Sequence, residues 1–148
     1  MPGKKPNHLD AAVSTFKPTD SSRTLESGVY LDDGSILKIE KTHPGDGILG
    51  KKVWKAGRTT KITTGVVVDD HATVKVWYGD VWRTFEDVVL VDGSCRGGDS
   101  GSPVFLQKGE QPSEEDELCG ILFAGSSRYW VHCKYKYLEK ELKVRWTA

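Results

Sequence analysis

The most specific stretch of this sequence lies at residues 95–105, where it reads Cys95-Arg-Gly-Gly-Asp-Ser-Gly-Ser-Pro-Val-Phe105. Three of its glycines permit backbone angles and close approaches that a Cβ atom would prevent. A tight loop of this kind can turn the amides of Gly98 and Ser100 toward one point, as oxyanion stabilisation requires. Because a serine hydroxyl is a weak nucleophile that needs such help, the pattern favours nucleophilic catalysis at Ser100. The alternative is an ordinary polar turn between two strands.

Composition bounds the class of protein. The chain has 148 residues, which suffices for one domain with a hydrophobic core. Acidic and basic residues number 21 each, so the formal net charge is zero and a general nucleic-acid or anionic-membrane partner is not expected. No apolar run approaches the ~20 residues of a membrane helix. Residues 1–10 carry no signal-peptide core, so the default expectation is a cytoplasmic protein.

Cysteine usage predicts neither a metal site nor a single redox state. The chain has three cysteines, at positions 95, 119 and 133. Their number is odd and no two of them form a Cys-x-x-Cys pair, so a zinc site is not expected. One disulfide with a free thiol and three buried thiols in a reducing compartment both remain open. We expect no metal and no other cofactor.

Short alternating segments separated by turn residues predict an all-β protein, either a sandwich or a barrel. Strands are expected at residues 8–16, 28–31, 35–39, 53–60, 61–68, 73–78, 81–85, 88–91, 118–125 and 129–133. Turns are expected at residues 32–34, 69–71 and 79–80, and a solvated acidic loop or hairpin tip at 107–117. Only residues 135–142 show helical spacing of apolar side chains. The five tryptophans are expected to fill the core and interfaces.

Several separated segments resemble the trypsin/chymotrypsin-like serine peptidases, in particular the bacterial and archaeal trypsin-like type. Residues 98–102 (GDSGS) resemble the nucleophile loop of that family, and residues 7–13 (NHLDAAV) its catalytic-aspartate strand. Residues 55–60 (KAGRTT) with the following Gly65-Val-Val67 resemble another stretch common in the group, and residues 120–126 (GILFAGS) one wall of the primary specificity pocket. The helix and its Leu142-Lys-Val144 ending resemble the C-terminal element. These segments follow the family's chain order from Asn7 to Val144.

The resemblance implies a fold and a set of roles. The fold would be the second antiparallel β-barrel of the two-barrel trypsin-like fold, with a short C-terminal helix. Residues 28–148 would form that barrel, and residues 1–27 an N-terminal segment with the aspartate strand and a linker. Ser100 would be the nucleophile, Asp10 the triad acid, and the Gly98 and Ser100 amides the oxyanion hole. Peptide substrate would bind along four residues of one strand and near one arginine: Phe123, Ala124, Gly125, Ser126 and Arg96.

The family's catalytic histidine has no counterpart in this pattern. It belongs in an N-terminal barrel several tens of residues before the aspartate, whereas nine residues precede Asp10 here. We therefore expect a serine endopeptidase that is inactive as this chain alone and needs a separate histidine-bearing barrel. The alternative is a catalytically inactive, peptidase-like module for peptide binding or assembly. A third reading is a truncated reading frame with no stable role.

Each histidine of the chain has a simpler interpretation than catalysis. His8 shares a strand face with Asp10 and could compensate for the missing base, although a surface histidine is the favoured interpretation. His43 and His71 lie in turn-rich segments and are expected to be solvated. His132 could line the specificity pocket and favour an acidic side chain, but packing beside Trp130 is favoured.

Overall fold

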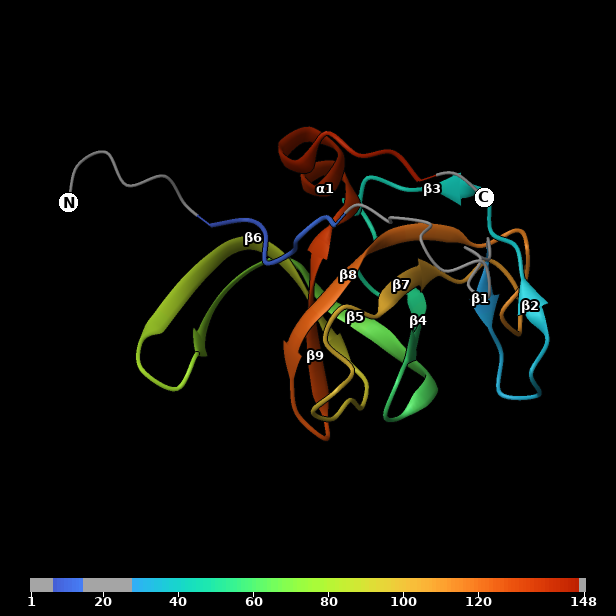
Figure 1. Ribbon diagram of the computed structural model, residues 1–148, viewed down its shortest axis with the longest axis horizontal. Coiled ribbons are helices and arrows are strands. Elements are labelled where there is room, and N and C mark those ends of the chain that lie inside the picture. The colour runs from blue at the N-terminus through green and yellow to red at the C-terminus, as the bar shows by residue number, and fades with distance from the viewer. Residues whose placement is uncertain (1–6, 15–27, 147–148) are drawn as a thin grey trace, which may run out of the picture.

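The computed structural model describes residues 7–14 and 28–146, and its chain folds around one closed β-barrel (Figure 1). Strands β4, β5, β6, β9, β8 and β7 form the ring in this order, with β7 returning to β4. Short β3 adds to β8 in parallel, and β1 pairs with β2 in a separate hairpin. The elements in chain order are β1 (Val29–Tyr30), β2 (Ile36–Leu37), β3 (Lys41–Thr42), β4 (Lys52–Gly57), β5 (Lys61–Trp77), β6 (Trp82–Asp92), β7 (Pro103–Leu106), β8 (Glu117–Gly125), β9 (Tyr129–Lys134) and α1 (Tyr135–Leu142). The predicted all-β barrel with one short C-terminal helix is confirmed.

Two apolar clusters occupy the two faces of the barrel wall. Strand β8 contributes to both, because Leu118 and Phe123 lie in one cluster and Cys119 and Leu122 in the other. A strand that is buried on both faces reads as a continuous apolar run in the sequence. This explains the uninterrupted apolar character of residues 118–124.

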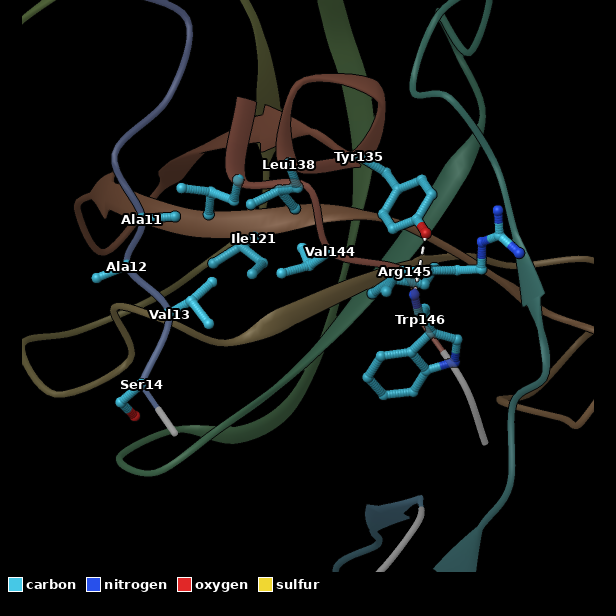
Figure 2. A pocket seen from close by; sticks show the side chains of 12 residues that line it. Ala11, Ala12, Val13, Ser14, Ile121, Tyr135, Leu138, Val144, Arg145 and Trp146 are labelled. Atoms are coloured by element: carbon cyan, nitrogen blue, oxygen red, sulfur yellow. Dashed lines mark hydrogen bonds between the residues drawn. The ribbon is translucent and has the colours of Figure 1, made fainter. Parts of the chain in front are cut away.

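Helix α1 and residues 11–14 lie over one face of the barrel and line an apolar pocket (Figure 2). Ala11 to Ser14 form one side of this pocket, and Tyr135, Leu138 and Trp146 lie on the other. The Trp146 indole donates to the carbonyl of Ile39 at 2.6 Å, and the Trp146 amide donates to the Tyr135 hydroxyl at 3.1 Å. The last described residues are thereby fixed against the barrel. Among the residues described, no helix has the length and apolar character needed to cross a bilayer.

The far halves of β5 and β6 extend beyond the barrel as a two-stranded arm, at the left of Figure 1. Its tip is the turn predicted at residues 79–80, closed by a hydrogen bond from the Tyr78 amide to the Val81 carbonyl at 3.0 Å. Trp77 and Trp82 face each other across the arm with ring centroids 5.3 Å apart. They are 51% and 62% exposed, so these two lie outside the core, whereas Trp54 and Trp130 are fully buried as predicted.

Three sequence predictions of local structure are wrong. Residues 69–71 do not form a turn, because β5 continues through them. The pairing of β5 with β6 shifts register at several points between Val67 and Val74, and these irregularities accommodate the polar residues. Residues 81–85 and 88–91 are likewise one strand, β6. Residues 8–14 form no strand, since the backbone makes only one bridge, from Asn7 to Phe85, while residues 15 and 16 lie outside the described part. The apolar side chains of Leu9 and Ala11 instead pack against the core without a β-ladder.

The acidic connection between β7 and β8 agrees with its predicted solvated character at most positions. Asp116 is the exception, because it is fully buried. Its carboxylate accepts the Trp54 indole N–H at 2.8 Å and the Lys108 and Ser113 amides at 2.9 Å each. The Asp116 carboxylate therefore holds the β7–β8 loop against the core.

Candidate active site

The loop around Ser100 joins β6 to β7 and is held in a tight series of turns. The Asp99 amide donates to the Arg96 carbonyl at 3.0 Å, and the Ser102 amide donates to the Asp99 carbonyl at 3.0 Å. Gly98 has a φ of 98°, and a Cβ atom there would lie 2.3 Å from the Thr59 hydroxyl oxygen. Both the backbone conformation and the available space therefore require glycine.

Asp99 is the internal anchor of this loop. Its buried carboxylate accepts hydrogen bonds from the amides of Thr59 at 2.9 Å, Thr60 at 3.1 Å and Arg96 at 2.9 Å, and from the Thr60 hydroxyl at 2.6 Å. Burial by itself would raise the pKa of Asp99, but the Thr60 hydroxyl and these amides outweigh it and hold the pKa well below its usual value. The carboxylate is therefore ionised, and it ties the loop to the β4–β5 turn.

A buried lysine faces this carboxylate. Lys55 is fully buried, with Nζ 3.8 Å from an Asp99 oxygen and hydrogen-bonded to the Thr60 hydroxyl at 2.6 Å and the Lys61 carbonyl at 2.9 Å. Burial lowers the pKa of Lys55, and the charge of Asp99 partly offsets this effect. The pairing explains why the KAGRTT segment and the Ser100 loop lie together, a contact that the sequence pattern did not predict.

Ser100 lies exposed at the edge of a groove that several predicted site residues share. Arg96, Ser100, Phe123, Ala124 and Gly125 all line it, joined on the arm side by Val76, Trp77 and Tyr78. Within the described residues, the amides of Gly98 and Ser100 donate to no acceptor. Ser126 does not line the groove; it lies in the β8–β9 turn, where its hydroxyl accepts the Tyr129 amide at 3.2 Å.

Strand β8 presents an open backbone edge to this groove. Its earlier part pairs with β7 as far as Ile121, which lies opposite Pro103. The Leu122 amide then donates to the Ser102 carbonyl, and the Leu122 carbonyl accepts the Gly101 amide. Beyond that point, Ala124 and Gly125 pair only with β9 in the described structure. An edge of this kind can accept an extended peptide as an additional strand.

Asp10 lies in a second, adjoining pocket with Asn7, Leu9, Arg83 and Phe85. Its carboxylate accepts a hydrogen bond from the Tyr78 hydroxyl. Tyr78 lines both the Asp10 pocket and the Ser100 groove, so the two spaces meet at its side chain. Burial, then the Asp10 hydrogen bond and charge, raise the pKa of Tyr78 well above its usual value. Sequence reasoning missed Tyr78, because a tyrosine beside a Gly-Asp turn carries no chemical signature.

None of the four histidines lines the Ser100 groove. His8 stacks on the Tyr137 ring at 4.4 Å, with Nδ1 2.8 Å from the Glu86 carbonyl oxygen. His43 is half-buried rather than solvated, and its Nδ1 accepts the Gly45 amide at 3.0 Å. His132 is fully buried and accepts the Trp130 indole N–H at 3.2 Å, as the packing interpretation predicts. Burial lowers the pKa of His132 to about 3, so its ring is neutral.

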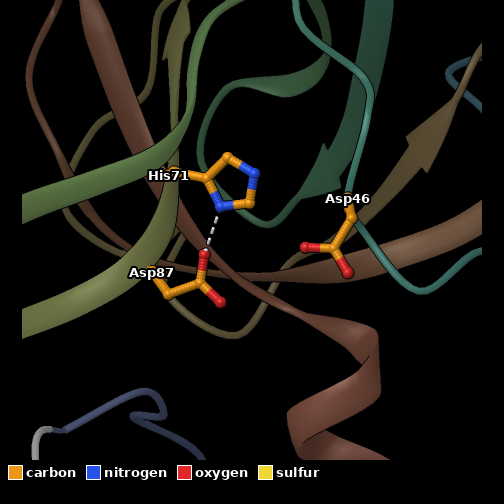
Figure 3. Close-up of side chains that lie close together, drawn as sticks. All are labelled: Asp46, His71 and Asp87. Carbon is orange, nitrogen blue, oxygen red and sulfur yellow. Dashed lines mark hydrogen bonds and ion pairs between the residues drawn. The ribbon is translucent and has the colours of Figure 1, made fainter.

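The remaining histidine, His71, belongs to a cluster of charged residues away from the groove (Figure 3). Asp46, His71 and Asp87 place ligand-type atoms within 4.8 Å of one another. The Lys134 ammonium lies among them, 2.6 Å from both carboxylates and 3.2 Å from His71 Nδ1. A second ammonium, that of Lys136, lies 2.9 Å from Asp46 and 3.5 Å from Asp87. The cluster is therefore an ion-pair network in which two lysines supply the positive charge.

All three cysteines are buried and unpaired. Of the two states that the sequence left open, the structure has three buried thiols. Cys95 lies beneath the groove, where its sulfur would be 2.5 Å from a Cβ atom on Gly125. Burial raises the pKa of all three thiols, to about 12 for Cys119 and about 11 for Cys133.

Comparison with known proteins identifies the architecture. No protein-family model and no curated protein sequence matches the chain. Protease A of Thermobifida fusca matches with a TM-score of 0.67 at 18% identity, over 87% of this chain and 65% of that one. A glutamic acid-specific serine protease matches with a TM-score of 0.62 at 24% identity, over 81% of this chain and 60% of that one. A Cellulomonas bogoriensis chymotrypsin matches with a TM-score of 0.60 at 15% identity, over 78% of this chain and 58% of that one.

This chain therefore spans less than two thirds of the length of these three proteases. Their identities are low, and the likeness is one of backbone architecture across most of this chain. The barrel described here has the fold of the bacterial trypsin/chymotrypsin-like serine proteases.

Proposed function

We propose that this chain is the C-terminal barrel of a trypsin-like serine endopeptidase whose active site is completed by a histidine-bearing barrel, in the same polypeptide or a separate one. Ser100 is the nucleophile, and Asp10 orients the incoming imidazole. The single observation that carries the proposal is the exposed Ser100 in a tight loop, with two unpaired amides, beside the open edge of β8.

The proposed reaction follows from this arrangement. Substrate peptide pairs with Phe123 to Gly125, with Arg96 near its side chains. The Ser100 proton passes to the imidazole as Oγ bonds to the carbonyl carbon, and the C=O electrons move to the oxygen, which the Gly98 and Ser100 amides stabilise. Collapse breaks the C–N bond, and the imidazolium gives its proton to the leaving amine. Water then attacks the acyl-enzyme by the same route and releases Ser100.

The test is fluorophosphonate labelling of the tagged chain in extracts of its source cells, where a completing barrel would be present. We expect the label on Ser100, mapped by mass spectrometry, and its loss in Ser100→Ala and Asp10→Asn. Ser102→Ala is the matched control, because that buried hydroxyl donates within the same loop to the Asp99 carbonyl. An unlabelled Ser100 in a chain that is present and folded would reject the endopeptidase proposal.

A second candidate function is an inactive module that binds peptides or assembles with other proteins. The observation that favours it is the absence of any histidine of this chain from the groove. In this case, peptides bind along β8 and the Ser100→Ala variant retains their affinity, while the parent turns none of them over. Measurable turnover that requires Ser100 would decide for the endopeptidase instead.

A further inference from the structure

The contact between Tyr78 and Asp10 joins segments that lie 68 positions apart in the chain. Tyr78 follows directly after β5 at the tip of the arm, and its ring centroid is 6.3 Å from that of Phe85. Its hydroxyl donates to the Asp10 carboxylate, and its side chain also lines the Ser100 groove. No other residue is shared by the Asp10 pocket and the Ser100 groove, among the residues described.

The tyrosine meets only half of the requirements of a triad histidine. An imidazole in this place would donate one N–H to the carboxylate and use its other nitrogen to accept the serine proton. A phenol has a single oxygen, and Tyr78 already commits its proton to Asp10. The raised pKa of Tyr78 keeps that proton in place, so the phenol cannot serve as the base.

We propose that Tyr78 is a gate residue, which fills the space beside Asp10 that the completing imidazole must enter and which has to swing out before the site can assemble. The inference rests on the proposed function. The two donors compete for the same carboxylate oxygen, because Tyr78 donates to Oδ2 of Asp10 and an imidazole N–H would need the same acceptor region.

The position of Tyr78 allows such a movement. The side chain is 44% exposed, and the next residue, Gly79, has a φ of 87° within the turn. A rotation about the side-chain bonds would carry the ring toward solvent without disturbing the barrel. With the gate closed, no imidazole can reach the Asp10 carboxylate, and a histidine-bearing barrel that docks over the arm would open it.

Free imidazole tests the gate without requiring the unknown barrel. In the intact chain carrying Tyr78→Ala, the vacated space should bind imidazole saturably, as measured by NMR shifts of the amides near Asp10. The parent should show no saturation over the same range. Addition of Asp10→Asn to the variant should weaken binding at least about tenfold, because the acceptor that orients the ring is lost. Trp82→Ala, at an exposed residue of the arm that lines neither the Ser100 groove nor the Asp10 pocket, is the matched control and should behave as the parent.

Ser100 reactivity supplies a second readout that separates the two proposals. We expect imidazole to raise the fluorophosphonate labelling rate of the Tyr78→Ala variant by about 100-fold, the lower end of the usual contribution of a general base, because a free imidazole is held less firmly than a side chain. Imidazole binding that depends on Asp10, without labelling of Ser100, would support the gate and reject the proposed catalysis. Equal imidazole affinity in parent and variant, or binding independent of Asp10, would overturn the gate.

Tyr78→Phe covers the case in which the alanine variant does not fold. It keeps the ring that packs near Phe85 but removes the competing hydroxyl. We expect it to bind imidazole saturably, at least about threefold more weakly than the alanine variant, because the ring stays but one charge-assisted hydrogen bond no longer holds it in place. An affinity no higher than that of the parent would contradict the gate.

Discussion

A single carboxylate, Asp99, accounts for much of the conformation of the Ser100 loop. It accepts four hydrogen bonds from Thr59, Thr60 and Arg96 while buried opposite Lys55. Removing one partner of a buried ion pair leaves an uncompensated charge, which usually costs more than the pair itself contributes. The loop is therefore shaped from beneath by a residue that does not line the groove.

Asp99→Asn should lower the free energy of unfolding by about 3–5 kcal/mol at pH 7, because Lys55 is left buried without its counter-charge. The folded pKa of Asp99 lies below the value of about 3.9 for an unfolded aspartate, so its stabilising contribution is complete above about pH 4 and declines as the pH falls further. Urea unfolding between pH 7 and pH 3 measures both effects.

The exposed Asp80→Asn, in the turn of the arm, is the control and should change stability by less than about 0.5 kcal/mol. The variant at Asp99 should also lose less stability than the parent on acidification. Equal acid sensitivity of parent and Asp99→Asn would contradict the role assigned to this carboxylate.

The three thiols make a second prediction at the residue scale. Because all are buried and their pKa values are raised, few thiolates exist near neutral pH and reagent access is poor. The native protein should react with a disulfide reagent at pH 8 at least about 100-fold more slowly than a free thiol. In urea, all three cysteines should react. Fast reaction in the native protein, or fewer than three equivalents in urea, would disagree with the structure.

At the scale of elements, Lys134 connects the end of β9 to three other parts of the chain. Its ammonium contacts Asp46 in the loop after β3, His71 in β5 and Asp87 in β6. Burial by itself would raise the pKa of Asp87, but hydrogen bonds from Lys134, Tyr137 and His71 hold it well below its usual value. The cluster thus fixes the start of α1 against the barrel.

Lys134→Met should lower the free energy of unfolding by about 3–5 kcal/mol, because two carboxylates lose the buried cation between them. Zn²⁺ binds carboxylate and imidazole ligands of this kind, and the Lys134→Met/Lys136→Met double variant removes both ammonium groups from them. Zinc should therefore raise the melting temperature of the double variant by several degrees and leave that of the parent unchanged. Thermal unfolding with and without zinc measures both effects.

Lys140→Met, at an exposed position of α1, serves as the control. Its free energy of unfolding should change by less than about 0.5 kcal/mol, and zinc should not alter its melting temperature. A Lys134→Met protein as stable as the parent would show that the cluster does not contribute to folding. A parent that zinc stabilises would show that the ammonium groups do not block the ligand set.

At the scale of the whole molecule, closure of the barrel depends on close contact between β8 and β9. Gly120 lies opposite Lys134 in the ladder, and a Cβ atom on it would be 2.0 Å from the Cys133 carbonyl oxygen. The backbone oxygen cannot move away without breaking the strand pairing. Glycine at this position is therefore required by space rather than by a positive φ.

Gly120→Ala should destabilise the protein by about 1–3 kcal/mol or more, because overpacking forces the two strands apart. The matched control is Gly109→Ala, where a Cβ atom meets nothing within 4 Å. Urea unfolding of the two variants compares them directly. Similar stability of both would show that the β8–β9 contact is looser than the structure indicates.

The parts that could be predicted from the sequence are those written in local patterns. Alternation of polar and apolar residues predicts the strands of the barrel, because a strand with one wet face repeats every two residues. The turn at residues 79–80 and the helix over residues 135–142 follow from equally local signals. The glycines around Ser100 indicate a tight loop before any fold is known, and two of them, Gly98 and Gly101, have the positive φ angles that favour glycine.

The same local signals mislead where distant contacts dominate. Asp69, Asp70 and His71 have the composition of a turn, yet they continue β5, because the Asp70 carboxylate accepts the Ile48 amide at 3.0 Å and the pairing with β6 persists across a bulge. The apolar residues after Asn7 read as a strand, but they reach the core through side chains alone.

The sequence by itself determined the all-β class and the C-terminal helix through periodicity, and the tight turn around Ser100 through glycine at particular positions. The choice of a barrel over a sandwich came from the family resemblance and not from periodicity. The tertiary structure alone decided which charges and rings meet: Asp99 with Lys55, Lys134 with Asp46 and Asp87, and Tyr78 with Asp10. Partners separated by tens of residues are brought together by the strand order of the closed sheet, and no local pattern contains that order.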